Sequence, residues 1–241
     1  MIIKAVLFDL DGTLLPLDQD LFVKTYFGAM SLKLAQYGFD REKMIQTVWG
    51  GTASMIANTS DLTNEDVLWA YFTSVYGDES AAAKPIFEDF YRNEFQNVKE
   101  VTSPDPRAAE VITMLKKRGI RVILATNPLF PSIATKSRIR WAGLSPDDFE
   151  LYTTYENSKR CKPNPDYYLE ILAKTGLMAE ECVMVGNDVE EDMIAQDLGM
   201  KVFLLTDCLI SRNNTDISQY PNGGFDELIT YLNALTDDQN K

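Results

Sequence analysis

Hydrophobic residues run almost without interruption through the first segment of the chain. Ile2, Ile3 and residues 5–8 are apolar, and Gly12 follows shortly after them. Such β-branched-rich runs predict strands that are buried on both faces, as in parallel sheets covered by helices. Similar runs recur at residues 120–126, 182–186 and 202–206, and helix-like segments separate them at residues 106–118, 132–141, 165–176 and 190–199. This alternation predicts an α/β core with a parallel sheet.

The stretch between the first strand and the rest has a different pattern, because no strand-like run occurs from about residue 17 to residue 97. Its apolar residues keep helical spacing, which predicts helices at about residues 18–37, 41–48, 63–76 and 79–96. The segment Val-Thr-Ser-Pro-Asp-Pro at residues 101–106 is typical of a linker. We expect an α/β core of residues 1–16 and 100–241, and an all-helical insertion of residues 17–99.

Charge and composition limit the possible partners. The 241 residues carry a formal net charge of −13, which disfavours nucleic acid and anionic membranes as partners. The N-terminal apolar run is too short for a signal peptide or a membrane span, and it carries two aspartates. The three cysteines are far apart, which fits reduced thiols in the cytoplasm.

The chain contains no histidine. This excludes Ser-His-Asp and Cys-His catalysis and every histidine-containing zinc site. Acid–base chemistry would therefore depend on Asp, Glu, Lys, Tyr or Cys side chains.

The most informative motif is Asp9-Leu10-Asp11-Gly12-Thr13-Leu14, directly after the first strand. Ligands of open parallel sheets bind beyond the carboxyl ends of the strands, where both carboxylates would project. Two close carboxylates repel each other, which favours a bound cation or a raised pKa on one of them. Gly12 allows a turn close to a ligand. A lone Asp-x-Asp could equally be a polar turn, but the whole hexapeptide in this position favours a functional site.

This hexapeptide resembles the opening motif of phosphatases in the haloacid dehalogenase superfamily. Thr126-Asn127, at the end of a predicted strand, is similar to the second motif of that family, where a hydroxyl and nearby amides bind phosphate. Lys162-Pro163 is similar to the third motif. The resemblance implies a Rossmann-like, doubly wound parallel sheet with an inserted all-helical cap.

The fourth motif is the acidic segment Gly186-Asn187-Asp188-Val189-Glu190-Glu191-Asp192. It departs from the common family form, because Asn187 stands where an acid is usual. Asp188 is then the better candidate for direct metal contact, and Asp192 is either another ligand or a residue behind the ligands. Glu190 and Glu191 fit an ordinary acidic helix N-terminus and are left out of the predicted site.

The resemblance implies a Mg²⁺-dependent phosphatase that acts on a small phosphorylated metabolite. Asp9 would attack phosphorus and form an aspartyl-phosphate, while Asp11 would act as general acid and then general base. Thr126, Asn127 and Lys162 would hold the phosphate oxygens. The expected metal ligands are Asp9, the main-chain carbonyl of Asp11, Asp188 and Asp192, whose oxygens suit Mg²⁺.

In the resembling family the helical insertion is a mobile cap that selects the substrate. Gly50, Gly51 and Thr52 are expected to form a substrate-facing loop between helices. No Lys or Arg occurs from residue 44 to residue 83, so we expect a neutral or cationic leaving group such as a sugar, polyol or nucleoside. The expected state is a monomer or a weak homodimer.

Two other activities of the family are disfavoured. A dehalogenase would need neither Asp11 nor the acidic segment, and a phosphonate-cleaving relative would need a lysine in the central part of the cap, which has none. A phosphomutase would use the same aspartyl-phosphate and pass it to a second hydroxyl. From a different class, the chain could be a non-catalytic binding or regulatory relative, for which Asn187 would be the first sign.

Overall fold

The computed structural model describes residues 2–213 and 215–236. Its centre is a six-stranded sheet in the order β3-β2-β1-β4-β5-β6, and every neighbouring pair is parallel. The strands are β1 Ala5–Phe8, β2 Arg121–Leu124, β3 Leu151–Tyr152, β4 Cys182–Gly186, β5 Lys201–Leu205 and β6 Asn222–Gly223. The predicted Rossmann-like parallel sheet is confirmed. In the described ranges no helix is long and apolar enough to cross a membrane.

The side chains of β1 alternate between two hydrophobic cores, because successive residues of a strand point to opposite faces. Val6 and Phe8 belong to a core that includes α5 (Pro106–Lys117) and α8 (Phe225–Thr236). Ala5 and Leu7 belong to a core that includes α7 (Pro165–Thr175). The sheet is therefore covered on both faces, as expected for a doubly wound fold.

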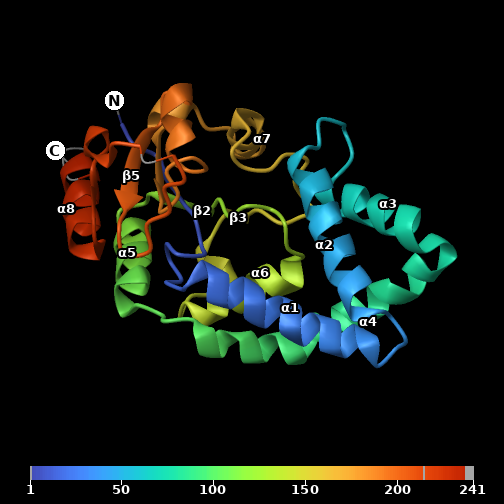
Figure 1. Cartoon of the computed structure of the whole chain (residues 1–241). Coiled ribbons are helices and arrows are strands. Elements are labelled where there is room, and N and C mark those ends of the chain that lie inside the picture. Colours follow the sequence, from blue (N-terminus) through green and yellow to red (C-terminus); the bar gives the residue numbers. More distant parts are fainter. Residues whose placement is uncertain (1, 214, 237–241) are drawn as a thin grey trace.

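Helices α1 to α4 follow β1 and precede β2 (Figure 1). They are α1 Gln19–Ala35, α2 Arg41–Ile56, α3 Asn64–Tyr76 and α4 Ser80–Arg92, followed by a 3₁₀ helix, Glu94–Val101. In Figure 1, α2 and α3 lie at the end of the molecule opposite α8. The expected division between residues 99 and 100 falls inside the 3₁₀ helix.

The helical insertion contacts the core at two separate places. Next to β1, Ser103 N donates to Pro16 O at 2.8 Å, so the two connecting segments lie together. On the other side, Asn58 Nδ2 donates to Lys159 O at 2.8 Å, and Asn64 N donates to Ser158 O at 2.8 Å. We call this second set of contacts the 58–65 seam.

Two predicted elements differ from the structure. The helix expected at residues 41–48 continues as α2 to Ile56, so Gly50, Gly51 and Thr52 are helical and do not form a loop. The helix expected at residues 190–199 is replaced by turns and a short 3₁₀ helix, Met193–Leu198. Just before this segment, the Asp188 side chain accepts hydrogen bonds from the backbone N–H groups of residues 190 and 191, which favours a tight turn.

The glycine pair in α2 allows close contact between α2 and α3. A Cβ atom at Gly50 would collide with the Tyr71 ring, and one at Gly51 would collide with the end of Leu68. Helical glycines each cost about 1 kcal/mol relative to alanine, so the contact between the helices must compensate for them.

We expect Gly50→Ala to destabilise the protein by about 1 kcal/mol, because overpacking against Tyr71 outweighs the gain in helix propensity. The matched control is Gly28→Ala in α1, where an added Cβ meets no atom within 4 Å and stability should rise by up to about 1 kcal/mol. Urea unfolding measures both variants. An equal increase in the free energy of unfolding for Gly50→Ala and Gly28→Ala would contradict the packing role of Gly50.

Candidate active site

The candidate site lies where the strand order reverses, at the carboxyl ends of β1 and β4. Asp9 follows β1, and its backbone N–H donates to the Val185 carbonyl at 2.9 Å. Ligands bind at such switch points in open parallel sheets. Gly12 adopts a positive φ of 84°, and a Cβ atom there would collide with the Asn187 side chain. The turn after β1 and the loop after β4 therefore pack directly against each other.

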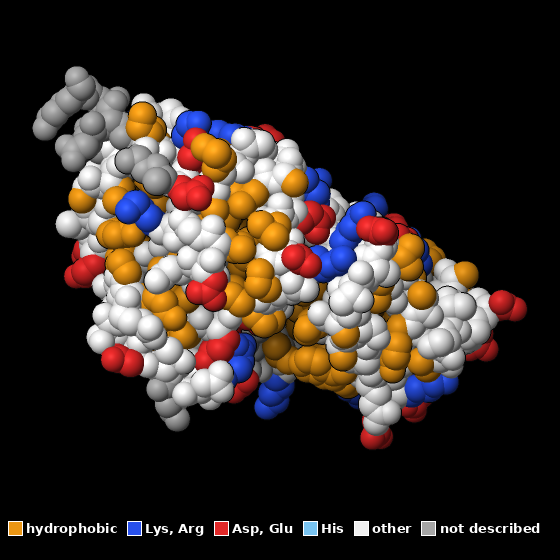
Figure 2. All heavy atoms as spheres, turned by 90° about the horizontal axis from the view of Figure 1, so that it is seen from above, with side chains coloured by type: hydrophobic (Ala, Val, Ile, Leu, Met, Phe, Trp, Pro, Cys, Tyr) orange, Lys and Arg blue, Asp and Glu red, His pale blue; other side chains and the backbone are white. Residues whose placement is uncertain are grey.

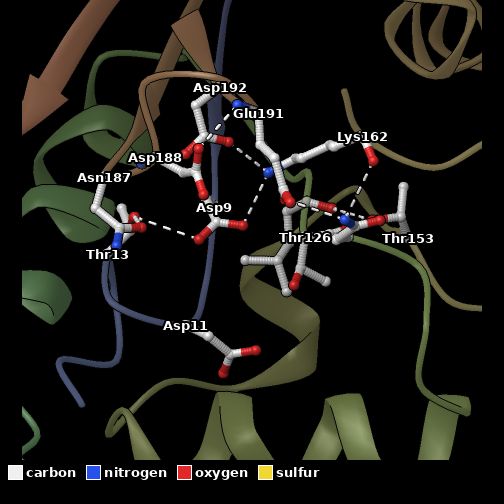
Figure 3. A network of polar contacts seen from close by, with 12 residues as sticks. Asp9, Asp11, Thr13, Thr126, Thr153, Lys162, Asn187, Asp188, Glu191 and Asp192 are labelled. Atoms are coloured by element: carbon white, nitrogen blue, oxygen red, sulfur yellow. Dashed lines mark hydrogen bonds and ion pairs between the residues drawn. The ribbon is translucent and has the colours of Figure 1, made fainter. Parts of the chain in front are cut away.

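A buried lysine joins two of the predicted aspartates (Figure 3). Lys162 Nζ donates to Asp9 Oδ1 at 2.9 Å and to Asp192 Oδ1 at 2.6 Å, and its side chain is only 1% exposed. Burial alone would lower the pKa of Lys162, but the charges of Asp192 and Asp9 outweigh it and raise that pKa well above its ordinary value. Burial also raises the pKa of Asp192. The lysine keeps a positive charge beside Asp9.

Thr126 lies beside Lys162 beyond the end of β2 (Figure 3), and Asn127 Nδ2 donates to the Lys162 carbonyl at 3.5 Å. The Thr126 carbonyl accepts hydrogen bonds from Thr153 Oγ1 at 2.6 Å and from the Tyr167 hydroxyl at 2.9 Å, which fixes the local backbone. Asn127 Nδ2 donates to Glu191 Oε2 at 3.0 Å, and Asn127 Oδ1 is buried without a partner. Glu191, left out of the predicted site, is thus part of the same network.

The loop after β4 places Asn187 and Asp188 in different surroundings. Thr13 Oγ1 donates to Asn187 Oδ1 at 2.9 Å and contacts Asp9 Oδ2 at 3.4 Å, so Thr13 connects the two loops. Asp188 forms an ion pair of 2.7 Å with Arg212, a residue that sequence reasoning missed. Burial raises the pKa of Asp188, and Arg212 opposes this effect.

The donor atoms at this edge of the sheet fit Mg²⁺. In the described part of the chain, no group of three or more His, Cys, Asp or Glu side chains could hold a metal ion by itself. Mg²⁺ rarely needs such a cage, since it keeps several waters and binds through one or two carboxylates. Asp9 Oδ1 accepts one hydrogen bond, from Lys162, and so keeps a lone pair for a metal, while Asp188 follows the neighbouring strand. Both oxygens of Asp192 accept hydrogen bonds from buried groups, which fits a positioning role, whereas Oδ2 of Asp188 pairs only with Arg212, whose side chain is 54% exposed.

The carboxylate of Asp11 points away from Lys162 in Figure 3. Its Oδ2 pairs with Arg138 of α6 (Ser132–Trp141), and its Oδ1 is buried without a partner. The Arg138 side chain is 1% exposed, and its guanidinium lies 4.2 Å from the centre of the Phe130 ring. Burial raises the pKa of Asp11 more than Arg138 lowers it. Sequence reasoning missed Arg138, because an arginine in a helix is usually exposed.

The predicted cap residues lie apart from this cluster. Gly50 and Gly51 contact α3, as described above, whereas Thr52 faces a cavity between the helical insertion and the core. Thr52 thus lines a cavity from within a helix rather than from the loop that the sequence suggested.

The chain is similar in sequence to several curated phosphatases. Ribulose-1,5-bisphosphate 5-phosphatase of Halopiger xanaduensis is 27% identical over 208 residues, which cover 83% of each chain. N-acetylmuramic acid 6-phosphate phosphatase of Pseudomonas aeruginosa is 23% identical and covers 83% of this chain and 80% of that protein. Phosphoglycolate phosphatase of Vibrio vulnificus is 26% identical over 85% of this chain and 84% of that protein.

Solved structures share the fold. A 2-haloacid dehalogenase from Pseudomonas syringae has a TM-score of 0.65 at 22% identity, with coverage of 97% of this chain and 99% of that one. The hydrolase YfnB from Bacillus subtilis, solved with bound magnesium, has a TM-score of 0.58 at 19% identity, with coverage of 97% and 100%. The family model for haloacid dehalogenase-like hydrolases matches residues 3–196. The chain belongs to the haloacid dehalogenase-like hydrolases.

Proposed function

We propose that this hydrolase is a Mg²⁺-dependent phosphatase that cleaves a small-molecule phosphate monoester through an aspartyl-phosphate on Asp9. The observation that carries the proposal is the buried Lys162, which holds Asp9 and Asp192 at the switch point of the sheet. A cation in this position orients the carboxylate nucleophile and attracts the anionic phosphate.

Asp9 would attack phosphorus through Oδ2, because Lys162 holds Oδ1. The new bond joins Asp9 to phosphorus, and the bond from phosphorus to the ester oxygen breaks. Lys162, Thr126 and Asn127 would bind the oxygens of the transferring group. Water would then attack phosphorus and release Asp9 with inorganic phosphate.

Asp11 would give its proton to the departing ester oxygen and later accept a proton from the attacking water. The raised pKa of Asp11 favours this exchange, since a general acid must carry a proton before the reaction. Arg138 would hold Oδ2, which leaves the unpartnered Oδ1 as the oxygen that transfers the proton.

Asp9, the main-chain carbonyl of Asp11, and Asp188 would hold Mg²⁺. When bound, the ion would offset the repulsion between the carboxylates and the phosphate and stabilise negative charge. Release of inorganic phosphate into water, rather than transfer to a second hydroxyl, distinguishes a phosphatase from a phosphomutase. A non-catalytic relative would release no phosphate.

Removing Mg²⁺ with EDTA is expected to abolish phosphate release, and adding Mg²⁺ should raise the Tm of the wild-type protein. A ligand at about 100 times its Kd stabilises the folded state by about 2.7 kcal/mol. Asp188→Asn should reduce this shift, whereas Glu190→Gln, on the same loop, should retain it. Phosphate release that is indifferent to EDTA, with a Tm indifferent to Mg²⁺, would contradict the metal dependence.

A further inference from the structure

A cavity of about 150 Å³ lies between the core and helices α1 to α4. Its core wall includes Asp11, Leu129 and Phe130, and the helical insertion closes the other side with residues such as Phe22, Thr52 and Trp69. Figure 2 shows hydrophobic side chains gathered where the surface is hollowed between the two parts of the molecule. We call this space the insertion cavity.

The insertion cavity adjoins the proposed phosphate site along the chain. Asp11 lies two residues beyond Asp9, and Leu129 lies two residues beyond Asn127. Both segments leave the same edge of the sheet and then enter the cavity wall. A phosphate monoester with its phosphorus at Asp9 would therefore direct its leaving group into this space.

The cavity wall is largely aromatic. Phe22 and Phe130 pack edge to face at 6.4 Å, and Tyr26 packs in the same way on Phe130 at 5.3 Å. The hydroxyl groups of Tyr26 and Tyr91 hydrogen-bond each other at 2.8 Å, so they do not need a ligand. Burial raises the pKa of Tyr26 to about 12, which reflects poor access of water. These surroundings favour apolar rings over groups that carry many hydroxyls.

The charges of the cavity wall also favour an uncharged leaving group. Among the described lining residues there is no Lys or Arg, and the only carboxylate is Asp11. A second phosphate or a carboxylate on the leaving group would therefore be desolvated with no free cation of the wall to pair with, since the neighbouring Arg138 is already held by Asp11. Two polar atoms are buried without partners, Asp11 Oδ1 and Trp69 Nε1. They can serve the ester oxygen and one further polar group, and the other polar side chains of the lining, such as Gln19, Thr52 and Tyr155, are few beside the aromatic ones.

The volume sets the size of the leaving group. An engineered apolar cavity of about 150 Å³ in another protein binds benzene. One six-membered ring therefore fills the insertion cavity, whereas a fused pair of rings or a nucleoside exceeds it.

We propose that the leaving group is an uncharged, mainly apolar alcohol or phenol of about one ring, as in benzyl phosphate. This inference rests on the proposed phosphatase function of the same site. It narrows the neutral or cationic leaving groups expected from sequence, because a sugar or polyol would leave most of its hydroxyls unpaired against aromatic side chains.

The test compares kcat/KM for benzyl phosphate, glucose 6-phosphate and phosphoglycolate, with acetyl phosphate as a substrate whose small leaving group needs little of the cavity. Benzyl phosphate should exceed both glucose 6-phosphate and phosphoglycolate by at least about tenfold. A wild-type preference for either of these two, with acetyl phosphate still hydrolysed, would overturn the inference and leave the proposed function intact.

A charge placed in the cavity provides the matched variants. Thr52→Lys adds a cation to the wall and should shift kcat/KM from benzyl phosphate toward phosphoglycolate by at least about tenfold. Gln46→Lys adds the same charge on the exposed face of α2 and should keep the wild-type preference. Identical preferences in the two variants would contradict the assignment of the cavity.

If no substrate is cleaved, a binding measurement distinguishes failure of the proposed phosphatase function from failure of the proposed apolar leaving-group site. Benzyl alcohol should bind the wild-type protein, as measured by calorimetry, and bind Thr52→Lys at least about tenfold more weakly. Binding of this kind without phosphate release from acetyl phosphate would disprove the phosphatase and support the apolar cavity. Equal or absent binding in both proteins would disprove the cavity assignment.

Discussion

Asp9→Asn is expected to lower kcat for phosphate release by at least about 10³-fold, with the fold retained. The amide keeps the shape of the side chain and can still accept a hydrogen bond from Lys162. It loses the anionic oxygen that attacks phosphorus, and no aspartyl-phosphate can form. Malachite green detection of phosphate measures the rate, and circular dichroism checks the fold.

The control for this variant is Asp207→Asn. Asp207 is an exposed aspartate that follows β5 at the same edge of the sheet. Its substitution removes the same charge and should leave kcat within about twofold of the wild type, because surface changes away from a site are usually small. An Asp9→Asn rate near that of Asp207→Asn, in material free of deamidated protein, would exclude Asp9 as the nucleophile.

Lys162→Met should both abolish phosphate release and destabilise the fold by about 3–5 kcal/mol. The lysine is the shared partner of Asp9 and Asp192, whose side chains are 11% and 1% exposed. Its removal leaves two buried carboxylates facing each other without a cation, which is the costly way to break a buried ion pair. Urea unfolding at neutral pH measures the loss of stability.

Lys159→Met is the matched control, three residues away on the same segment. Lys159 is 44% exposed and pairs with the fully exposed Asp61 at 3.4 Å, so its loss should change stability by less than about 1 kcal/mol. Similar losses of stability in the two variants would mean that Lys162 is not a structural cation in the folded protein.

The elements with long, regular patterns could be predicted from the sequence. The apolar runs that became β1, β2, β4 and β5 are four or five residues long and almost fully buried. By contrast, β3 and β6 have two residues each, which is too short for any periodic signal. Gly50 and Gly51 suggested a loop because local propensity disfavours them in helices, and packing against α3 overrode that preference.

The residues of the candidate site could be predicted to lie together where short motifs mark them. Asp9, Thr126 and Lys162 follow or precede regular elements, and the sheet brings them to one edge. The partners that determine their charges were not predictable. Arg138 meets Asp11 across 127 positions of sequence, and in its own helix it resembles any surface arginine. Only the tertiary structure shows that Arg138 is a buried partner of Asp11 and not a surface arginine.

The 58–65 seam affects how a product could leave. With the helical insertion bonded to the core there as well as beside Pro16, widening the space that would hold the freed alcohol requires one set of these bonds to part. Each such hydrogen bond contributes about 0.5–1.5 kcal/mol net, so separating a few of them gives an open form that is rare yet reachable by thermal motion.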